Sequence, residues 1–471
     1  MMLYSLIAFF LRVRSLVETF DVIVIGAGSA GVSAALRAAG QGARVCIIEQ
    51  DRIGGSCLHS GLYPIKLGRD LLKDNKSDFS VNGVINVKKL FLTITETMKR
   101  LSHRWEQKLV ESGVTIKTGI GLPLSSALVQ VGSNGKTFDM GTKKIIIATG
   151  SSPVPLATLP FEGDIIIPTD DIFKNHSIPD RVFIMGGDGS GCELSDFYQM
   201  LGSKVFLNSD GSRLFPDQDP DVIDALEQSL KRLKIKLLLG KKISSYFKNN
   251  ECLDITLAEG IKFQADQIIL NLNRQGNSEN LKCDTLGVRV GDTKELLVND
   301  KLETSVPGIF AVGSATGRRS RPGISEEEGK IAADNAMGKN KSINYDWIPF
   351  IVFAKPEIAS VGCFTEQSHY KGFRGIEGNA QSENLDFSFL DNENGGFFKI
   401  VADARSGVVI GGQIVSPNAS QLISLVGLAV KKGLKVGALV SLATDKSGEI
   451  EGIREAARLC SSAIKSNIES L

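Results

Sequence analysis

The segment Asp21-Val22-Ile23-Val24-Ile25-Gly26-Ala27-Gly28-Ser29-Ala30-Gly31 decides how the rest of the chain is interpreted. Its apolar start predicts a buried strand, and the glycines Gly26, Gly28 and Gly31 lead into an alanine-rich helix that reaches about Ala39. A second apolar strand, 44–48, ends at Glu49. Glycines at this spacing permit a tight turn, close backbone approach to a pyrophosphate and close helix packing. An acid about 20 residues later binds ribose hydroxyls. The segment therefore predicts a βαβ dinucleotide-binding unit.

Length and composition allow only broad predictions about the number of domains, the partners and the compartment. A length of 471 residues predicts several domains, and a net charge of +1 gives no indication of nucleic acid or of an anionic membrane. The seven cysteines are scattered, which is typical of a reduced intracellular protein. The apolar run 3–11 is too short to span a bilayer. We expect a cytoplasmic protein, or one of a mitochondrial or other organelle matrix if residues 1–19 are a presequence.

The segment 54–66 carries a more specific pattern, Gly-Gly-Ser-Cys-Leu-His-Ser-Gly-Leu-Tyr-Pro-Ile-Lys. It resembles the flavoprotein disulfide reductases, such as dihydrolipoamide dehydrogenase, glutathione reductase and mercuric reductase. Their motif GG-T/S-C-x4-C-x-P-x-K begins the helix beneath the flavin, and Gly55, Ser56, Cys57 and Lys66 match it. Leu62 stands where the family has its second cysteine. Because leucine cannot form a disulfide with Cys57, the resemblance implies that dithiol chemistry is lost. Cys57 itself remains either a single reactive thiol or an inert residue.

Three further segments resemble the FAD-binding part of the same family. The strand 144–150 closes on Ala-Thr-Gly, 268–277 is similar to the "GRxPN" return, and 304–315 is similar to the second FAD motif. Ser314 replaces the aspartate of that motif, so we expect a weaker hydrogen bond to the ribityl chain. Ser325 spells a capping box with the glutamates after it and is expected to begin a helix. The resemblance implies that FAD is bound by Gly26, Gly28, Gly31, Glu49, Gly55, Ser56, Lys66, Ala148, Thr149, Gly150, Arg274, Gly313 and Ser314.

A second nucleotide-binding pattern follows at 181–207. A strand over 181–185 leads into Gly186-Gly187-Asp188-Gly189-Ser190-Gly191-Cys192-Glu193, and then into a helix to about residue 201. The pattern resembles the family's pyridine-nucleotide domain, with Gly186 and Gly191 retained and Asp188 in place of the middle glycine. Two like charges about 4 Å apart repel by about 4 kcal/mol at an effective dielectric constant near 20, so we expect weakened NAD(P) binding. In the family, Glu193 pairs with the lysine matched by Lys66, and we expect that pair here.

From Trp347 onward the pattern becomes α+β and resembles the family's dimerisation domain, which implies a homodimer. That domain donates a histidine–glutamate pair to the partner's active site, and alignment places Lys446 and Glu451 at these two positions. The chain has four histidines, none of them beyond His369. A lysine with a pKa near 10 is a poor proton carrier for a thiol at neutral pH.

The sequence thus predicts an α/β fold with two Rossmann-like dinucleotide-binding domains, for FAD and NAD(P), and a C-terminal α+β dimerisation domain. The expected parts are an extension over 1–19, an FAD domain over 20–152 and 277–345, an NAD(P)-binding-like domain over 153–276 and a dimerisation domain over 346–471. No metal site is expected. The candidate catalytic residues are Cys57, Lys66, Glu193, Lys446 and Glu451.

Three functions remain open at this point. The first is a flavoenzyme that passes electrons from NAD(P)H or another donor to a small-molecule or protein acceptor other than a disulfide. The second is a non-catalytic paralogue that keeps FAD and the dimer fold for assembly or regulation. The third is a single-thiol enzyme that uses Cys57.

Overall fold

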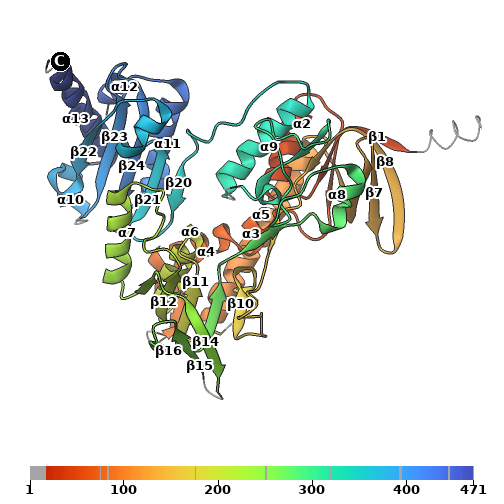
Figure 1. Ribbon diagram of the computed structural model, residues 1–471, viewed down its shortest axis with the longest axis horizontal. Coiled ribbons are helices and arrows are strands. Elements are labelled where there is room, and N and C mark those ends of the chain that lie inside the picture. Colours follow the sequence, from red (N-terminus) through yellow and green to blue (C-terminus); the bar gives the residue numbers. More distant parts are fainter. Residues whose placement is uncertain are drawn as a thin grey trace, which may run out of the picture.

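The computed structural model describes residues 17–74, 76–81, 84–174, 177–249, 252–318, 321–391, 395–443 and 446–469. The chain forms three lobes, with the first and last in sequence side by side and the second below them in the view of Figure 1. Among the described helices, none is both long and apolar enough to cross a membrane. The first 16 residues, which hold most of the expected extension, lie outside the described ranges.

The first lobe is built on a sheet in the order β5-β2-β1-β8-β7-β6, with β19 paired to β8. The segments 22–25 of β1, 45–48 of β2 and 145–147 of β8 are buried and apolar, as is typical of parallel strands covered on both faces. Because β19 comes from late in the chain and pairs in parallel with β8, residues on both sides of the second lobe share one sheet. The strands are β1 (Glu18–Ile25), β2 (Val45–Glu49), β5 (Thr115–Thr118), β6 (Ile120–Ser125), β7 (Leu128–Ser133), β8 (Lys136–Ile147) and β19 (Ile309–Ala311).

Helices complete the first lobe. Small residues on α2 (Ser29–Ala39) let α9 (Pro322–Ala336) pack closely against it, and a Cβ added to Gly329 of α9 would lie 2.3 Å from the Ala30 carbonyl oxygen. The long amphipathic helix expected near 87–113 is α5 (Val87–Glu111). The expected helix start at Ser325 is wrong. The helix α9 begins at Pro322, because proline at the first position already has a helical φ, and Ser325 is buried inside the first turn.

The second lobe contains a parallel sheet in the order β10-β17-β11-β12-β13 and a smaller antiparallel sheet. The predicted second βαβ unit is confirmed as β11 (Arg181–Met185), α6 (Gly189–Met200) and β12 (Lys204–Ser209). Two short strands, β9 (Ser151–Pro153) and β18 (Arg274–Gly276), pair where the chain leaves the first lobe and returns to it. The other elements are β10 (Ile166–Pro168), α7 (Pro220–Arg232), β13 (Lys236–Leu239), β14 (Ile243–Lys248), β15 (Leu253–Leu257), β16 (Lys262–Ala265) and β17 (Gln267–Leu270).

The third lobe is an antiparallel sheet in the order β20-β21-β24-β23-β22. Side chains alternate across it: Ala359, Phe398 and Ile414 join the core beneath the helices α11 (Ala419–Lys432) and α13 (Ile450–Glu469), so the lobe is α+β as predicted. Its strands are β20 (Phe350–Val352), β21 (Glu357–Gly362), β22 (Gly375–Gln381), β23 (Phe397–Asp403) and β24 (Val409–Ser416).

Candidate functional site

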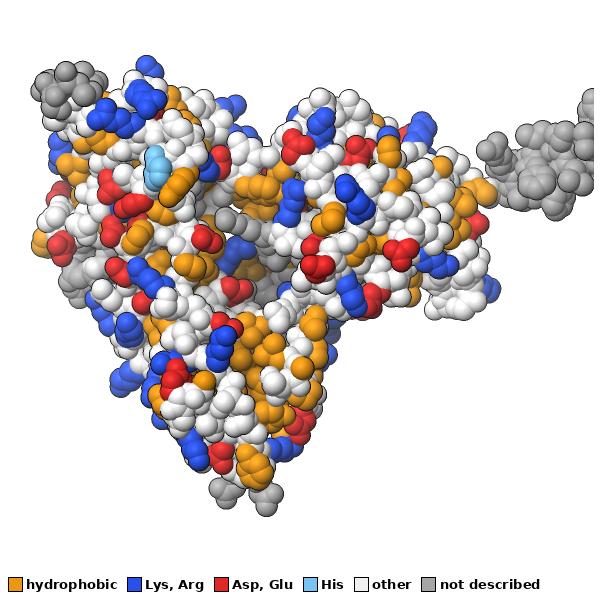
Figure 2. Space-filling model, in the orientation of Figure 1, with side chains coloured by type: hydrophobic (Ala, Val, Ile, Leu, Met, Phe, Trp, Pro, Cys, Tyr) orange, Lys and Arg blue, Asp and Glu red, His pale blue; other side chains and the backbone are white. Residues whose placement is uncertain are grey.

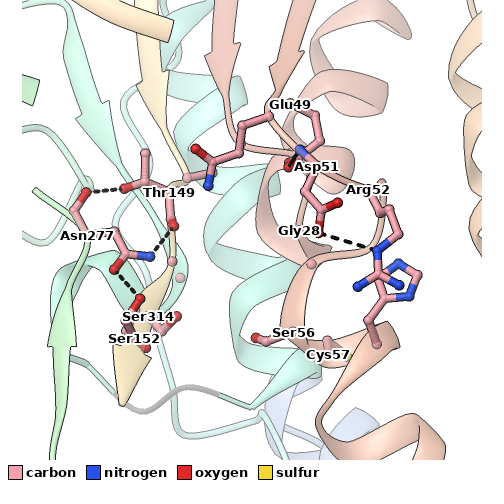
Figure 3. Close-up of a pocket in the computed structure, with 18 of the residues that line it drawn as sticks. Gly28, Glu49, Asp51, Arg52, Ser56, Cys57, Thr149, Ser152, Asn277 and Ser314 are labelled. Carbon is pink, nitrogen blue, oxygen red and sulfur yellow. Dashed lines mark hydrogen bonds and ion pairs between the residues drawn. The ribbon is translucent and has the colours of Figure 1, made fainter. Parts of the chain in front are cut away.

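A cavity of about 830 Å³ lies in the first lobe, where β1 and β8 end and α2 begins. This is the place at which doubly wound sheets bind nucleotides. Figure 3 shows Glu49, Asp51 and Arg52 on one side of the cavity, Thr149, Ser152 and Asn277 on the other, and Gly28 between them. The predicted site residues that line it are Gly26, Gly28, Glu49, Gly55, Ser56, Cys57, Ala148, Thr149, Gly150, Gly313 and Ser314.

The three loop glycines are needed for different reasons. Gly26 has a φ of +100°, and a Cβ there would lie 2.3 Å from the Ala148 carbonyl oxygen. A Cβ on Gly31 would lie 2.0 Å from the Gly26 carbonyl oxygen, so both glycines are required by the protein's own packing. A Cβ on Gly28 would meet no protein atom within 4 Å. The space above Gly28 is therefore open to a ligand.

The start of α2 suits an anion. Its N-cap residue is Gly28, and no side chain caps the helix, which leaves the first N–H groups available. These groups and the positive end of the helix dipole favour a phosphate. The open space at Gly28 and the uncapped helix end together fit the pyrophosphate of a dinucleotide.

Glu49 is held at the end of β2 by backbone donors. Its Oε2 accepts a hydrogen bond from the Ala27 N–H at 2.6 Å, and its Oε1 accepts one from the Asp51 N–H at 2.9 Å. A carboxylate offers about four lone-pair positions, so further ones remain for ribose hydroxyls. The acid lies in the cavity wall, where the sequence analysis expects it.

The opposite wall is held together by Asn277. Its Nδ2 donates to the Thr149 carbonyl at 2.9 Å, the Thr149 hydroxyl donates to the Asn277 carbonyl at 2.9 Å, and the Ser152 hydroxyl donates to Asn277 Oδ1 at 2.8 Å. Sequence reasoning selected Arg274 from the same segment. Arg274 instead pairs with Asp170 at 2.7 Å and does not line the cavity. The asparagine at the end of the "GRxPN"-like stretch was the signal that could have found this wall.

Cys57 lies on the short helix α3 (Gly55–His59), at the edge of the cavity near Ser56 (Figure 3). Burial raises the pKa of its thiol far above the ordinary value, and the Glu326 carboxylate adds to the shift. All seven cysteines are free thiols, and Cys57 is the one that lines the cavity. Leu62 begins the next helix, α4 (Leu62–Asp74). The site therefore presents one protonated thiol at neutral pH.

The expected ion pair between Lys66 and Glu193 is wrong. Lys66 pairs with Asp70, one turn along its own helix, at 2.7 Å. Glu193 is 1 % exposed, and its carboxylate accepts hydrogen bonds from Arg321 Nη1 at 3.2 Å and from the Phe353 N–H at 3.1 Å. Burial raises the pKa of Glu193, and the charge of Arg321 opposes that shift. An arginine distant in sequence has taken the place expected for the lysine.

The second glycine loop repeats the backbone of the first. Gly186 has a φ of +119°, and a Cβ on Gly191 would lie 1.8 Å from the Gly186 carbonyl oxygen. Here Asp188 is the N-cap residue of α6, and its Oδ1 accepts a hydrogen bond from the Gly191 N–H at 3.0 Å. Gly186 and Gly191 thus build this loop and lie outside the cavity of the first lobe.

Lys446 and Glu451 share a different cavity, of about 400 Å³, in the third lobe. Glu451 is 7 % exposed and pairs with Arg454 at 2.8 Å, whereas Lys446 is exposed. The structure therefore brings these two predicted residues together, apart from the cavity that contains Cys57. Among the described residues, no group of three or more His, Cys, Asp or Glu is arranged to hold a metal ion.

Comparison with known proteins agrees with this architecture. The family model of the pyridine nucleotide-disulphide oxidoreductases matches residues 20–337, and that of their dimerisation domain matches 348–443. Dihydrolipoyl dehydrogenase from Thermus scotoductus is 30% identical over 459 residues, which cover 93% of this chain and 97% of that protein. Mercuric reductase from Lysinibacillus sphaericus is 29% identical and is covered to 82%, with 93% of this chain matched.

Solved structures give the same result. The crystal structure of LpdA from Mycobacterium tuberculosis matches with a TM-score of 0.85 at 25% identity, over 93% of this chain and 99% of that one. The fold is shared with the HOCl-induced flavoprotein disulfide reductase RclA from Escherichia coli, at 21% identity and a TM-score of 0.80. Fold and cavity together define a flavoprotein oxidoreductase. The chain belongs to the pyridine nucleotide-disulphide oxidoreductase family, whose dimerisation domain fits a homodimer.

Proposed function

We propose that this protein is an FAD-dependent oxidoreductase whose electron acceptor is not a disulfide. The observation that carries the proposal is the single thiol in the cavity, Cys57, with Leu62 where the family motif has a second cysteine. Passing two electrons to a disulfide substrate through the protein requires two sulfurs that can bond to each other. A leucine cannot supply the second.

The residues of the cavity fit FAD. Gly28 and the uncapped start of α2 would hold the pyrophosphate, Glu49 would hold a ribose, and Ser314 would hold the ribityl chain with one neutral hydrogen bond. When bound, FAD supplies hydride and electron transfer to the acceptor. The protein's own part is to bind the cofactor, to orient it and to keep Cys57 protonated beside it.

The proton carriers expected in a dithiol enzyme also differ. Lys446 replaces the family's histidine, and it lies on the exposed rim of the third-lobe cavity. Histidine is the side chain that suits proton transfer at neutral pH, and the family's histidine is replaced at this position. We therefore propose a small molecule such as a quinone, a metal ion or a partner protein as the acceptor. Figure 2 shows the surface hollowed where the three lobes meet, with side chains of both charges around the hollow.

The donor is proposed to be NAD(P)H bound weakly, or another reductant. A second candidate function is a non-catalytic paralogue that keeps FAD and the dimer for assembly or regulation. The capped second glycine loop favours this candidate, because Asp188 already occupies an N–H group of α6.

An anaerobic experiment on the FAD-loaded dimer separates these functions. The flavin is reduced with dithionite, excess reductant is removed, and the return of flavin absorbance is followed with a quinone, with lipoamide and with glutathione disulfide. We expect fast reoxidation by the quinone and none by the two disulfides. Reduction of lipoamide at ordinary enzymatic rates would overturn the proposal. A flavin that no acceptor reoxidises would favour the non-catalytic paralogue.

A further inference from the structure

We infer that the second nucleotide-binding domain excludes NAD(P), because the chain's own side chains fill the mouth of its glycine loop. The inference rests on the proposed function and names the residues that oppose NAD(P) binding. Of the two kinds of donor proposed, it leaves a reductant other than NAD(P)H. The family implies a pyridine nucleotide here, and the residues present do not fit one.

The first obstacle is the carboxylate of Asp188. Its Oδ1 accepts the Gly191 N–H at 3.0 Å and the Asn271 side-chain N–H at 2.6 Å. The Gly191 N–H belongs to the first turn of α6, one of the groups that a phosphate needs at a helix start. The protein's own anion already occupies this position, and Asn271 fixes it from the loop after β17.

The second obstacle is Arg321, which comes from the first lobe. A Cβ added to Gly189 would lie 1.5 Å from Arg321 Nη2, so the guanidinium lies directly on the first residue of α6. The same group binds Glu193 and lies over the Phe350 ring, with 5.3 Å from Cζ to the ring centroid. Gly189 is buried as a result. A dinucleotide that crosses this glycine meets an arginine that is fixed on two sides.

Moving Arg321 away from the loop would cost free energy. The side chain of Glu193 is 2 % exposed, and its charge is balanced by Arg321. Removal of the arginine alone leaves a buried carboxylate without its cation, which is strongly unfavourable. Asp188, Asn271 and Arg321 together block the loop, and the buried Glu193 carboxylate behind them holds Arg321 in place.

The same helix provides a matched control. One turn further along α6, Asp196 pairs with Arg69 of α4 at 2.7 Å, and Asp196 is 2 % exposed. This pair also joins the first and second lobes through a buried acid and an arginine. It takes no part in the glycine loop, so its removal tests the effect of losing a buried ion pair on α6 by itself.

The experiment is calorimetric titration of the FAD-loaded dimer with NAD⁺ and with NADP⁺, which measures binding without flavin reduction. The unaltered protein is expected to show no saturable binding up to roughly 1 mM, the upper end of ordinary KM values. Asp188→Gly removes the carboxylate and is mild for folding, since glycine is tolerated at an N-cap. It is expected to tighten binding by at least about tenfold.

The pair Glu193→Gln with Arg321→Leu removes the guanidinium without leaving a charge buried. Combined with Asp188→Gly, it is expected to tighten binding by roughly a thousandfold in total. The control pair Arg69→Leu with Asp196→Asn is expected to bind no better than the unaltered protein. Tight binding of either nucleotide by the unaltered protein overturns the inference, as does a folded triple variant that still binds neither. Both results leave the choice of acceptor untouched, which depends on reoxidation and not on nucleotide binding.

Discussion

The two glycine loops share a backbone conformation, but the space in front of the helix is open in the first loop and filled in the second. In each, the first glycine has a positive φ and the last packs against its carbonyl, at Gly26 and Gly31 in one and at Gly186 and Gly191 in the other. They differ at the middle position. Gly28 leaves open space and an uncapped helix, whereas Asp188 caps its helix and Arg321 covers the next residue. The outer glycines are thus required by the fold, whereas the residue at the middle position decides whether there is room for a nucleotide.

The comparison explains why a glycine loop of this kind is kept whether or not it binds a nucleotide. Gly186 and Gly191 are required by packing alone, because a Cβ on either would lie about 2 Å from a carbonyl oxygen, at 2.1 Å and 1.8 Å. Such glycines remain necessary whether or not a nucleotide binds. A glycine-rich fingerprint is therefore stronger evidence for the turn than for the ligand.

The largest effect is expected when the first loop is given the residue of the second. Gly28→Asp should weaken FAD binding by roughly a thousandfold, because it places a carboxylate beside the pyrophosphate. The flavin absorbance of the purified protein measures the result. Gly28→Ala is the control for bulk without charge, and circular dichroism should show both variants folded, since the added Cβ meets no protein atom within 4 Å. A fully yellow Gly28→Asp protein would contradict the assignment of this cavity to FAD.

The next effect concerns the charge behind the second loop. Arg321→Leu alone should destabilise the protein by about 3–5 kcal/mol, since Glu193 is left buried without a cation. Burial already raises the pKa of Glu193 above its ordinary 4.5. Its ionisation therefore lowers stability as pH rises through that window, and more so without Arg321. Urea unfolding at about pH 5 and about pH 8 should show a larger deficit at the higher pH.

Adding Glu193→Gln should recover much of this loss, because the double variant no longer buries a charge. Equal deficits for Arg321→Leu at both pH values would contradict the role assigned to Glu193 here.

A smaller effect is expected from removing the ion pairs that attach α9 to α2, the helix of the first glycine loop. Asp334 of α9 accepts hydrogen bonds from Arg37 of α2, Lys341 and Lys339. Burial opposes its ionisation, but these partners outweigh it and hold the pKa of Asp334 well below its ordinary 3.8. Asp334→Asn should cost about 1–2 kcal/mol at neutral pH, since the three cations are themselves half exposed.

The sign of the pH dependence follows from the lowered pKa. The stabilisation by Asp334 is complete above pH 3.8 and is lost as pH falls below it, so the difference between the two proteins should shrink in acid. It should also shrink in high salt. A difference that stays constant through the acid range would exclude the ion pairs as its source.

The smallest effect is expected at Cys57. Cys57→Ser should change the rate of flavin reoxidation by a quinone by less than about twofold, because a protonated thiol takes no part in that transfer. Alkylation by iodoacetamide, followed by mass spectrometry, should modify Cys57 slowly in the folded protein and faster after unfolding. Loss of the quinone reaction in this variant would support the single-thiol enzyme instead.

The sequence predicted most of what depends on short-range pattern. Both βαβ units, the long helix α5 and the α+β third lobe follow from apolar periodicity and glycine spacing, and the structure confirms them. Asp188 was identified from the loop alone. These features lie within a few turns of one another, where periodicity carries the information.

The missed contacts are those between distant segments. Arg321 reaches Glu193, and Asn277 closes on Thr149, each across 128 positions of sequence. No local pattern marks such partners, so the lysine expected from the family motif was assigned to Glu193 in error. The prediction that a helix starts at Ser325 was wrong for a different reason, because a proline three residues earlier already satisfies the geometry of a first helical turn.

Buried ion pairs also fasten the lobes to one another. Besides Glu193 with Arg321 and Asp196 with Arg69, Lys399 of the third lobe is 3 % exposed and holds Asp219 at the start of α7, at 2.8 Å. Burial raises the pKa values of Glu193 and Asp196, so these two carboxylates take up protons before the acids of the surface do. Because folding raises these two pKa values, protonation of Glu193 and Asp196 is easier in the folded protein than in the unfolded chain, and mild acid should leave these seams between the lobes closed. Small-angle scattering would record that result as a radius of gyration that stays constant as the pH falls to about 5.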